Sequence, residues 1–234
     1  MKSKYYFPHT ATVFFLLTVA VALFSWIGSI YGLGKVQSLL SPEGIRWELR
    51  HAMGNFVQTP ALGIVMMLFL GFGITVHSGV WGTLGRIVRG KPISRKEKRA
   101  LILAGCMLLV YIIMIIGTTF APWTMLRSVT GSLTNSPFQK GIYYLISFGV
   151  GLSGMAFGYA SGRFRDDKDI IRGMSCLFSR FADYFVVLFF IVQFFSSLMY
   201  TNLVEWVGID SYIVSYVFHI CCYLPFAWML NRKK

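Results

Sequence analysis

The chain has 234 residues, of which 56% are hydrophobic and only 13% are charged, and its formal net charge is +13. Six stretches of about 20 residues each contain no Asp, Glu, Lys or Arg, and a soluble domain of this length has no core that could bury them all. The composition therefore excludes a soluble globular protein and indicates an all-α, polytopic integral membrane helix bundle.

A helix needs roughly 20 apolar residues to cross a bilayer, because it rises about 1.5 Å per residue through a core about 30 Å thick. The first uncharged stretch lacks a small-residue cleavage site and is too long for a signal peptide, so we expect it to be a retained span. Residues 1–234 are interpreted as a single transmembrane domain. The uncharged stretches predict about six transmembrane helices: Ala11–Tyr31, Pro60–Leu84, Ala100–Trp123, Gly141–Gly162, Tyr184–Leu203 and Ser211–Leu230.

Two segments between the spans predict amphipathic helices. Ser41 and Pro42 are typical of a helix start, and residues 42–56 are expected to form a helix at the outer interface. Its apolar stripe consists of Ile45, Leu49, Ala52, Met53 and Phe56. A second such helix follows Asp166 on the inner side, with Ile170, Ile171, Met174, Leu177, Phe178 and Phe181 as its apolar stripe. Either helix could pack on the bundle instead of on lipid.

Basic residues are concentrated on one side of the predicted membrane. Of the 22 Lys and Arg residues, 17 lie before the first span, in segments 86–99 and 163–180, or after the last span. By the positive-inside rule, both termini are expected in the cytoplasm and the protein in the inner cell membrane. The basic loop Arg86–Arg99 is interpreted as a topology signal with affinity for anionic lipid, and no nucleic-acid partner is expected.

Small residues repeat along the fourth span. Gly154, Gly158 and Gly162 recur at every fourth position, and Ser147 and Gly151 form a second row. Such rows let a neighbouring helix approach closely. Packing within this chain's own bundle is the favoured interpretation, and a dimer interface is the alternative.

The sequence gives no support for an enzyme. Four histidines, His9, His51, His77 and His219, lie in different segments, and none belongs to a triad or an HExxH motif. The four cysteines form no C-x-x-C pair. We therefore expect no catalytic residues, no bound cofactor and no metal site.

A few polar side chains in or near the last two spans are candidate transport residues. Asn202 is singled out because Tyr200-Thr201-Asn202 places polar groups together at the end of a span. Gln193, Asp183 and His219 complete the set, although Asp183 is also interpreted as a solvated end group. Gln193 and Asn202 are nine positions apart, so in a straight helix they point to nearly opposite faces.

Several short motifs, in a fixed order, carry a resemblance to a known family. They are Ser38–Trp47, Asn55-Phe56, Leu70–Gly73, Ser78-Gly79, Glu97–Leu101, Gly131–Leu133, Ser136–Phe138, Lys140–Ile142, Phe189-Phe190, Gln193-Phe194 and Thr201–Leu203. Together they resemble the AbgT family of ion-coupled transporters of p-aminobenzoyl-glutamate, which is also linked to the export of antifolate sulfonamides. The resemblance covers roughly residues 38 to 203.

The same resemblance implies two re-entrant hairpins that carry the solute and ion residues. The first is expected between the second and third spans, where this chain has only the short segment Gly85–Arg99. The second is expected after Asn202, where the sequence continues into one more span. The chain is therefore interpreted as a shortened member without the hairpin regions.

Two functions follow as alternatives. By resemblance, the chain is an AbgT-type transporter of p-aminobenzoyl-glutamate or a related antifolate or aromatic-amide solute. The alternative is a non-transporting scaffold or accessory subunit that has lost the transport core. The expected partners are the lipid bilayer, a small aromatic-amide solute, and a second copy of the chain or a partner subunit.

Overall fold

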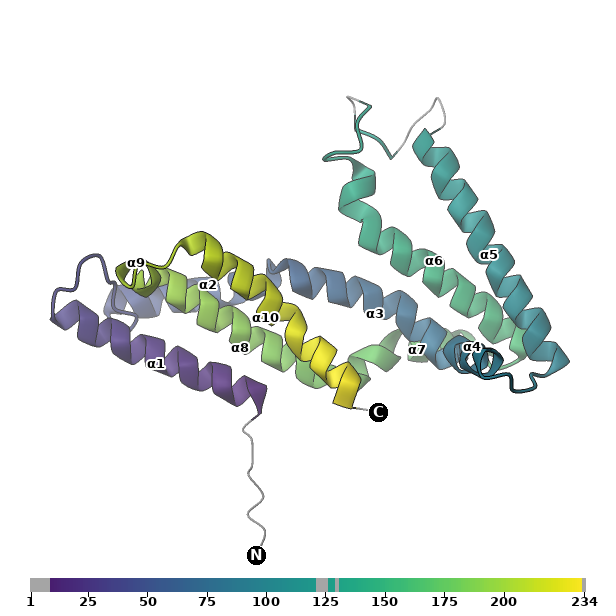
Figure 1. The fold of residues 1–234 in the computed structure, drawn as a ribbon, viewed down its shortest axis with the longest axis horizontal. Helices are drawn as coiled ribbons and strands as arrows, with labels where there is room; N and C mark the ends of the chain where they lie inside the picture. Colours follow the sequence, from purple (N-terminus) through teal and green to yellow (C-terminus); the bar gives the residue numbers. More distant parts are fainter. Residues whose placement is uncertain (1–8, 121–125, 129–130, 233–234) are drawn as a thin grey trace, which may run out of the picture. The chain divides into compact units, whose positions relative to one another are not determined.

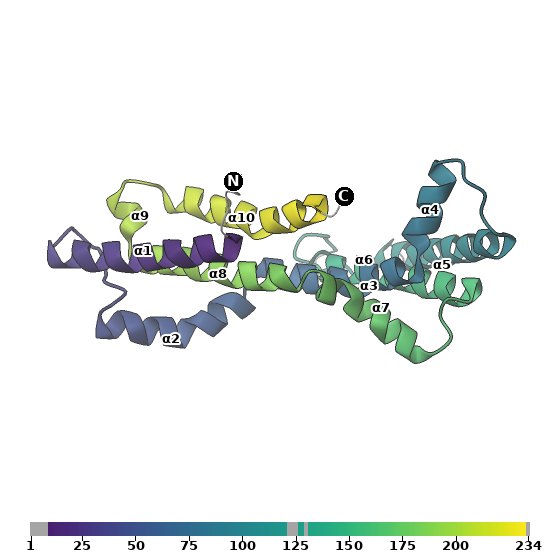
Figure 2. The same ribbon diagram turned by 90° about the horizontal axis from the view of Figure 1, so that it is seen from below.

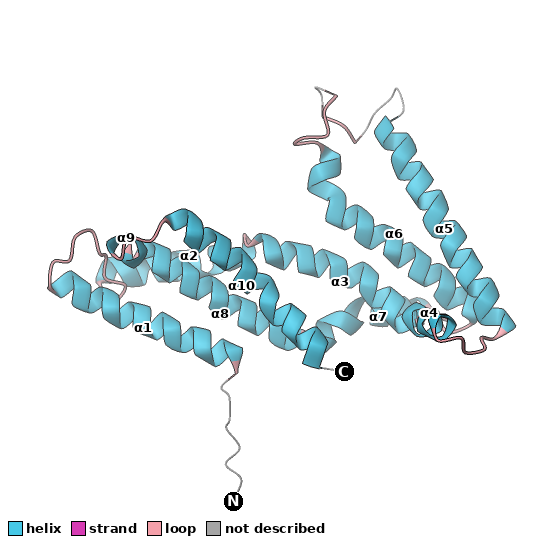
Figure 3. Ribbon diagram, in the orientation of Figure 1, coloured by secondary structure: helices cyan, strands magenta, loops and turns pink. Residues whose placement is uncertain are grey.

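The computed structural model describes residues 9–120, 126–128 and 131–232. Within these residues every regular element is a helix (Figure 3). The chain divides into two compact units. Unit 1 comprises Met1–Gly63 and Phe181–Lys234, and unit 2 comprises Ile64–Arg180. The single transmembrane domain expected over residues 1–234 stays a prediction.

Unit 1 is assembled around one helix, α8 (Ala182–Tyr200). Helices α1, α2 and α10 all pack against α8, and in Figure 2 α2 and α10 lie on opposite sides of it. The buried side of α8 includes Tyr184, Leu188, Ile191 and Phe195. The other helices of unit 1 are α1 (Thr10–Ile30), α2 (Pro42–Val57), the short α9 (Leu203–Trp206) and α10 (Ser211–Arg232).

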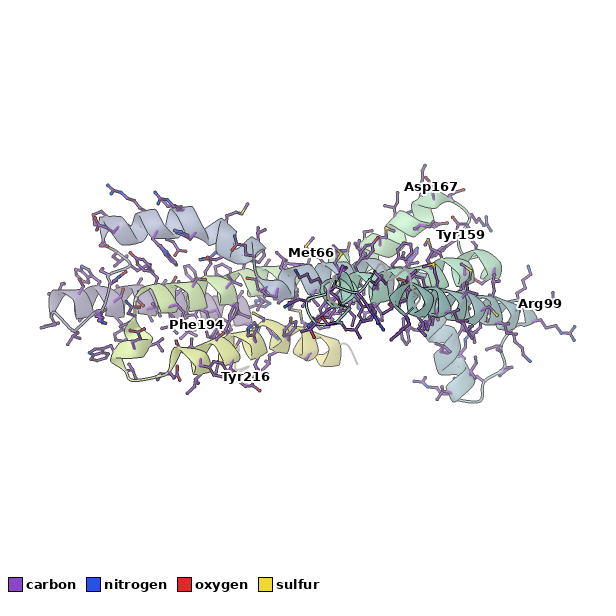
Figure 4. All side chains as sticks on the ribbon, turned by 90° about the horizontal axis from the view of Figure 1, so that it is seen from above. Met66, Arg99, Tyr159, Asp167, Phe194 and Tyr216 are labelled. Atoms are coloured by element: carbon purple, nitrogen blue, oxygen red, sulfur yellow. The ribbon has the colours of Figure 1, made fainter. Side chains whose placement is uncertain are left out.

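Two edge-to-face aromatic contacts join α1 to α8. Phe14 and Phe15 of α1 meet Phe194 and Phe190 of α8, with ring centroids 5.7 and 5.8 Å apart. By contrast, Tyr216 on α10 is 65% exposed and points away from the unit (Figure 4). An apolar, exposed surface of this kind is what a membrane helix presents to lipid.

Unit 2 contains a long helical hairpin and three shorter or partial elements. Helices α5 and α6 run side by side along their lower halves and form the hairpin in Figure 1. The helices of unit 2 are α3 (Pro60–Ser78, in this unit from Ile64), α4 (Val80–Val88), α5 (Arg95–Phe120), α6 (Pro137–Ser161) and α7 (Asp167–Arg180).

Five of the predicted spans coincide with helical stretches that are long and apolar enough to cross a membrane, although the bounds of the second one differ from the prediction. They are Thr10–Ile30, Pro42–Ser78 (α2 with α3), Arg95–Phe120, Pro137–Ser161 and Ala182–Tyr200. The sixth predicted span is helical as α10 (Ser211–Arg232), and its apolar stretch Ser211–Ala227 is not counted among these five. The predicted end of the third span at Trp123 lies outside the described residues.

The prediction of one continuous span over Pro60–Leu84 is wrong. The helix ends at Ser78, and α4 begins at Val80 after Gly79, whose φ of +80° places it in the left-handed region. A Cβ at Gly79 would collide with the guanidinium of Arg163, which donates a 2.8 Å hydrogen bond to the main-chain oxygen of Ser78. Only glycine fits here, because it must both turn the chain and admit this side chain.

The small residues of α6 pack against α3 within unit 2, as the favoured interpretation predicted. A Cβ at Gly154 would lie 2.7 Å from Thr75 Cγ2 and 3.0 Å from Thr75 N. One row over, Ser147 Oγ accepts a 3.0 Å hydrogen bond from the Gly71 N–H and donates to the Met67 carbonyl. Gly158, by contrast, packs on the ring of Phe164 just beyond the helix, so the row does not serve a single neighbour.

The second amphipathic helix is present as α7. It contacts α3 within unit 2 through Phe178, whose ring centroid lies 5.5 Å from that of Phe69, and through the main chain at Gly173, which is close to Gly73. Ile171 is 62% exposed. The predicted apolar stripe is therefore only partly turned toward the unit.

The amino-terminal end of α7 is closed by an aspartate. Asp169 accepts hydrogen bonds from the N–H groups of Arg165 (2.9 Å) and Asp166 (3.4 Å). These two donors hold the pKa of the Asp169 carboxyl below its usual range.

Candidate functional site

The predicted start of α2 is confirmed in detail. The Ser41 hydroxyl accepts a 3.1 Å hydrogen bond from the Gly44 N–H, and Pro42 occupies the first turn. A Cβ at Gly44 would collide with the main-chain oxygens of Ser38 and Leu39, so the segment before α2 folds tightly back on it. This cap fixes the direction in which α2 leaves the loop.

Helix α2 lies antiparallel to α8, in a register set by three successive contacts. Phe56 meets Phe189 with ring centroids 5.4 Å apart. One turn earlier on α2, Ala52 accepts the hydrogen bond of Gln193. At the other end, the Trp47 and Tyr200 rings stack at 4.3 Å.

The predicted apolar stripe of α2 is divided between two surfaces. Ala52 and Phe56 turn toward α8, whereas Leu49 and Met53 are 79% and 72% exposed. The alternative in which this helix packs on the bundle is therefore correct for one side of the stripe. The other side stays available to lipid.

A cavity of about 300 Å³ lies between α2, α8 and α10, entirely within unit 1. Its wall combines aromatic rings with three polar side chains, and it contains no charged residue. The lining residues are Trp47, Asn55, Phe195, Ser196, Met199, Tyr200, Val214, Ser215 and Phe218. Aromatic walls with a few polar groups are typical of small-molecule sites.

The structure places Gln193 at the α2–α8 contact. Its side chain is 5% exposed, and its Nε2 donates a 2.9 Å hydrogen bond to the Ala52 oxygen. Asn202 lies past the end of α8 in the left-handed region (φ +54°), and its Nδ2 donates a 3.3 Å hydrogen bond to the Lys35 oxygen. This conformation ends α8 at Tyr200, three residues before the predicted end.

Asp183 and His219 are both exposed. His219 lies one residue after Phe218 of the cavity wall, and the two ring centroids are 5.6 Å apart. No hydrogen bond, ion pair or ring contact found in the described part of the chain joins any two of the four candidate residues. Their role in transport stays a prediction.

Sequence reasoning missed most of the cavity wall. Trp47 was visible only as the last residue of a family motif, and Tyr200 only as a neighbour of Asn202. Trp47 and Asn55 are eight positions apart on one helix, which brings them to one face. That spacing was a usable signal, but it does not reveal which helix covers the face.

A second polar cluster, in unit 2, was also missed. Glu97 at the start of α5 accepts from Arg86 of α4 at 2.5 Å and from Arg163 after α6 at 3.2 Å. Because Arg163 also bonds to the Ser78 oxygen, the cluster ties together the ends of α3, α4, α5 and α6. Its ion pairs and hydrogen bonds join groups of unit 2, so the cluster fastens these helix ends to one another.

The residues joining α4 to α5 are 89–94. This connection is too short for the re-entrant hairpin that the family resemblance implies between the second and third spans. The short basic segment is what the sequence predicted at this place.

Two solved structures share the fold. MtrF of Neisseria gonorrhoeae, described as illuminating a class of antimetabolite efflux pumps, is 16% identical with a TM-score of 0.77, over 87% of this chain and 71% of that chain. The YdaH transporter of Alcanivorax borkumensis, described as having an unusual topology, is 15% identical with a TM-score of 0.73, over 86% of this chain and 74% of that chain. No curated protein sequence matches this one.

A sequence model of a protein family also matches the chain. The model described as the "AbgT putative transporter family" matches residues 86–214, which is more than half of the chain. Together with the apolar helices, this match identifies an integral membrane protein with a transporter fold. The chain belongs to the AbgT transporter family.

Proposed function

We propose that the chain is an AbgT-type transporter of small aromatic solutes, of the class of p-aminobenzoyl-glutamate and related antifolates. Family membership supports transport, and the observation that carries the solute class is the cavity in unit 1. Trp47, Tyr200 and Phe218 offer flat apolar faces to an aromatic ring. Asn55 offers an amide that can bond to the amide or sulfonamide of the solute.

The charge of the cavity ranks solutes within this class. None of its lining residues is Lys, Arg or His, so the two carboxylates of p-aminobenzoyl-glutamate would have no partner there. An uncharged sulfonamide or p-aminobenzamide should therefore bind more tightly than the dianion. The setting we propose is the inner membrane, with both termini cytoplasmic, and assembly with a second copy or a partner subunit.

The test is uptake into proteoliposomes containing only the purified protein, with a sodium or proton gradient. Labelled p-aminobenzoyl-glutamate and an uncharged sulfonamide are compared. We expect uptake that falls by at least about tenfold in Trp47→Ala, because the stacked wall of the cavity is lost. The matched control is Trp206→Ala, whose exposed side chain lies outside the cavity wall. Equal loss in both variants would contradict the assignment of the cavity.

A non-transporting scaffold is the second candidate, and the short connection of residues 89–94 favours it. Under this hypothesis the chain is stable and correctly inserted, yet it drives no gradient-dependent uptake of either solute. Such a result would contradict transport by this chain alone. Uptake that disappears in Asn202→Ala would contradict the scaffold hypothesis and place a contact at Asn202.

A further inference from the structure

Buried polar atoms without a hydrogen-bond partner are concentrated at the α2–α8 contact. Five such side-chain atoms occur among the described residues, and three of them belong to facing turns of these two helices: Glu48 Oε2, Gln193 Oε1 and Ser197 Oγ. Buried polar groups are otherwise almost always paired. Three unpaired oxygens at one place therefore indicate a site for a further bonding partner.

The positions of the three residues follow from the helix register. Gln193 bonds to Ala52, which lies one turn after Glu48 on α2, and Ser197 lies one turn after Gln193 on α8. Because the helices are antiparallel, Ser197 comes beside Glu48, close to its carboxylate but without a hydrogen bond of standard geometry. Gln193 and Ser197 are 5% and 0% exposed. Glu48 is half-buried, but its Oε2 atom is enclosed, so the three oxygens share one seam.

All three unpaired atoms are oxygens, and Gln193 already spends an amide N–H on Ala52. A carboxylate, an amide carbonyl and a hydroxyl are ligands for a hard cation. Within the described part of the chain, no Lys or Arg forms an ion pair with Glu48. The imidazole of His51, on the same helix, is exposed and bonds to the Trp47 oxygen.

We propose that Glu48, Gln193 and Ser197 bind a monovalent cation of the size of Na⁺ at the α2–α8 seam. One carboxylate balances one positive charge, whereas a divalent ion would leave a net charge buried, which is costly. The ion would join α2 to α8 beside the aromatic cavity, and this role does not depend on transport.

The first experiment measures stability in detergent, with the pH and ionic strength held constant. Wild-type protein is unfolded by heat in NaCl, KCl and choline chloride. At a Na⁺ concentration about tenfold above the Kd, we expect the midpoint to rise by roughly 3–6 °C over that in choline chloride. Equilibrium binding of radioactive Na⁺ should show one site per chain.

The decisive variant is Glu48→Gln, which keeps the shape and removes the charge. It should be at least as stable as wild type in choline chloride, since an unpaired, half-buried charge is gone, and it should no longer respond to Na⁺. Ser197→Ala should weaken Na⁺ binding without abolishing it. The matched control is Glu43→Gln, on an exposed carboxylate of the same helix, which should respond as wild type.

Four results would overturn the proposal. One is equal midpoints in NaCl and choline chloride without radioactive Na⁺ binding, as expected if a water or a proton satisfies the site. Another is a Na⁺ response that survives in Glu48→Gln. The third is a larger response to Ca²⁺ than to Na⁺, and the fourth is equal destabilisation of Glu48→Gln in every salt.

Discussion

The side-chain amide of Gln193 on α8 donates its 2.9 Å hydrogen bond to the main-chain oxygen of Ala52, 141 residues earlier in the sequence. A helix oxygen that already accepts from its own helix has a second lone pair available. Gln193 uses it to fasten α2, which is otherwise held by aromatic stacking, to the central helix of unit 1.

Replacing Gln193 with Leu should therefore loosen α2. In Na⁺-free buffer we expect a loss of about 1–3 kcal/mol in the free energy of unfolding, together with faster amide exchange over α2. Chemical unfolding and hydrogen exchange measure the two effects. Gln58→Leu, at an exposed position at the end of α2, should change stability by less than about 0.5 kcal/mol. Unchanged exchange of α2 in the Gln193 variant would contradict this account of the contact.

Two glycines on neighbouring helices should respond in opposite directions to the same substitution. Gly154→Ala places a methyl group against Thr75, within 3.0 Å of its main-chain nitrogen, and should destabilise unit 2 by about 1–3 kcal/mol. Gly105→Ala, where a Cβ would meet no atom within 4 Å beyond its chain neighbours and its own helix backbone, should stabilise α5 by up to about 1 kcal/mol. Thermal unfolding of both variants measures the difference, and equal midpoints would mean that α3 and α6 are not in close contact.

Glu97→Gln removes the only anion of the cluster with Arg86 and Arg163 among the described residues. We expect a loss of about 1 kcal/mol, since both arginines are partly exposed and the network is screened by solvent. The difference from wild type should shrink in 1 M salt, where the Debye length is about 3 Å. Glu205→Gln, on an exposed carboxylate outside the described ion pairs, is the control. A salt-independent loss would show that packing, and not charge, is responsible.

Asp169 predicts a pH dependence at the start of α7. Its folded-state pKa is below the unfolded value, so its contribution to stability is complete above the unfolded pKa of about 3.9 and is lost as the pH falls through the folded pKa. The midpoint difference between wild type and Asp169→Asn should be constant from pH 5 upward, to about 8. It should vanish at the acid end of the range. A difference that grows with acidity would contradict the capping role.

Topology can be tested with reporter fusions. Fusions within residues 86–99 and after Lys234 should report the cytoplasm, and a fusion at Asn135 should report the opposite side. The basis is the charge asymmetry of the loops. A far-side signal from residues 86–99 would overturn the proposed orientation, whatever the solute.

Local signals in the sequence were enough for most helices. The start of α2 was predicted from Ser41 and Pro42, because a cap and a helix-initiating proline act on their own neighbours. The long spans were predicted because lipid demands continuous apolar segments, whatever the tertiary contacts.

Features that depend on distant partners were not predictable in the same way. The break between α3 and α4 at Gly79 depends on Arg163, 85 residues after the Ser78 oxygen that it binds. The buried surface of α2 depends on Gln193 and Tyr200, which belong to a helix far along the chain. A hydrophobic period shows that a helix has an apolar face, but it does not say which part of that face another helix will cover.

The two units differ in when they can be completed during synthesis. Unit 2 is one continuous segment, Ile64–Arg180, so its helices can pack as they emerge. Unit 1 depends on α8, and its two earlier helices are made long before that partner exists. At a synthesis rate of roughly 5–20 residues per second, α8 is made on the order of 10 s after α2. During that interval Glu48 is not covered by α8, and its carboxylate remains accessible to water or lipid headgroups until α8 has been made.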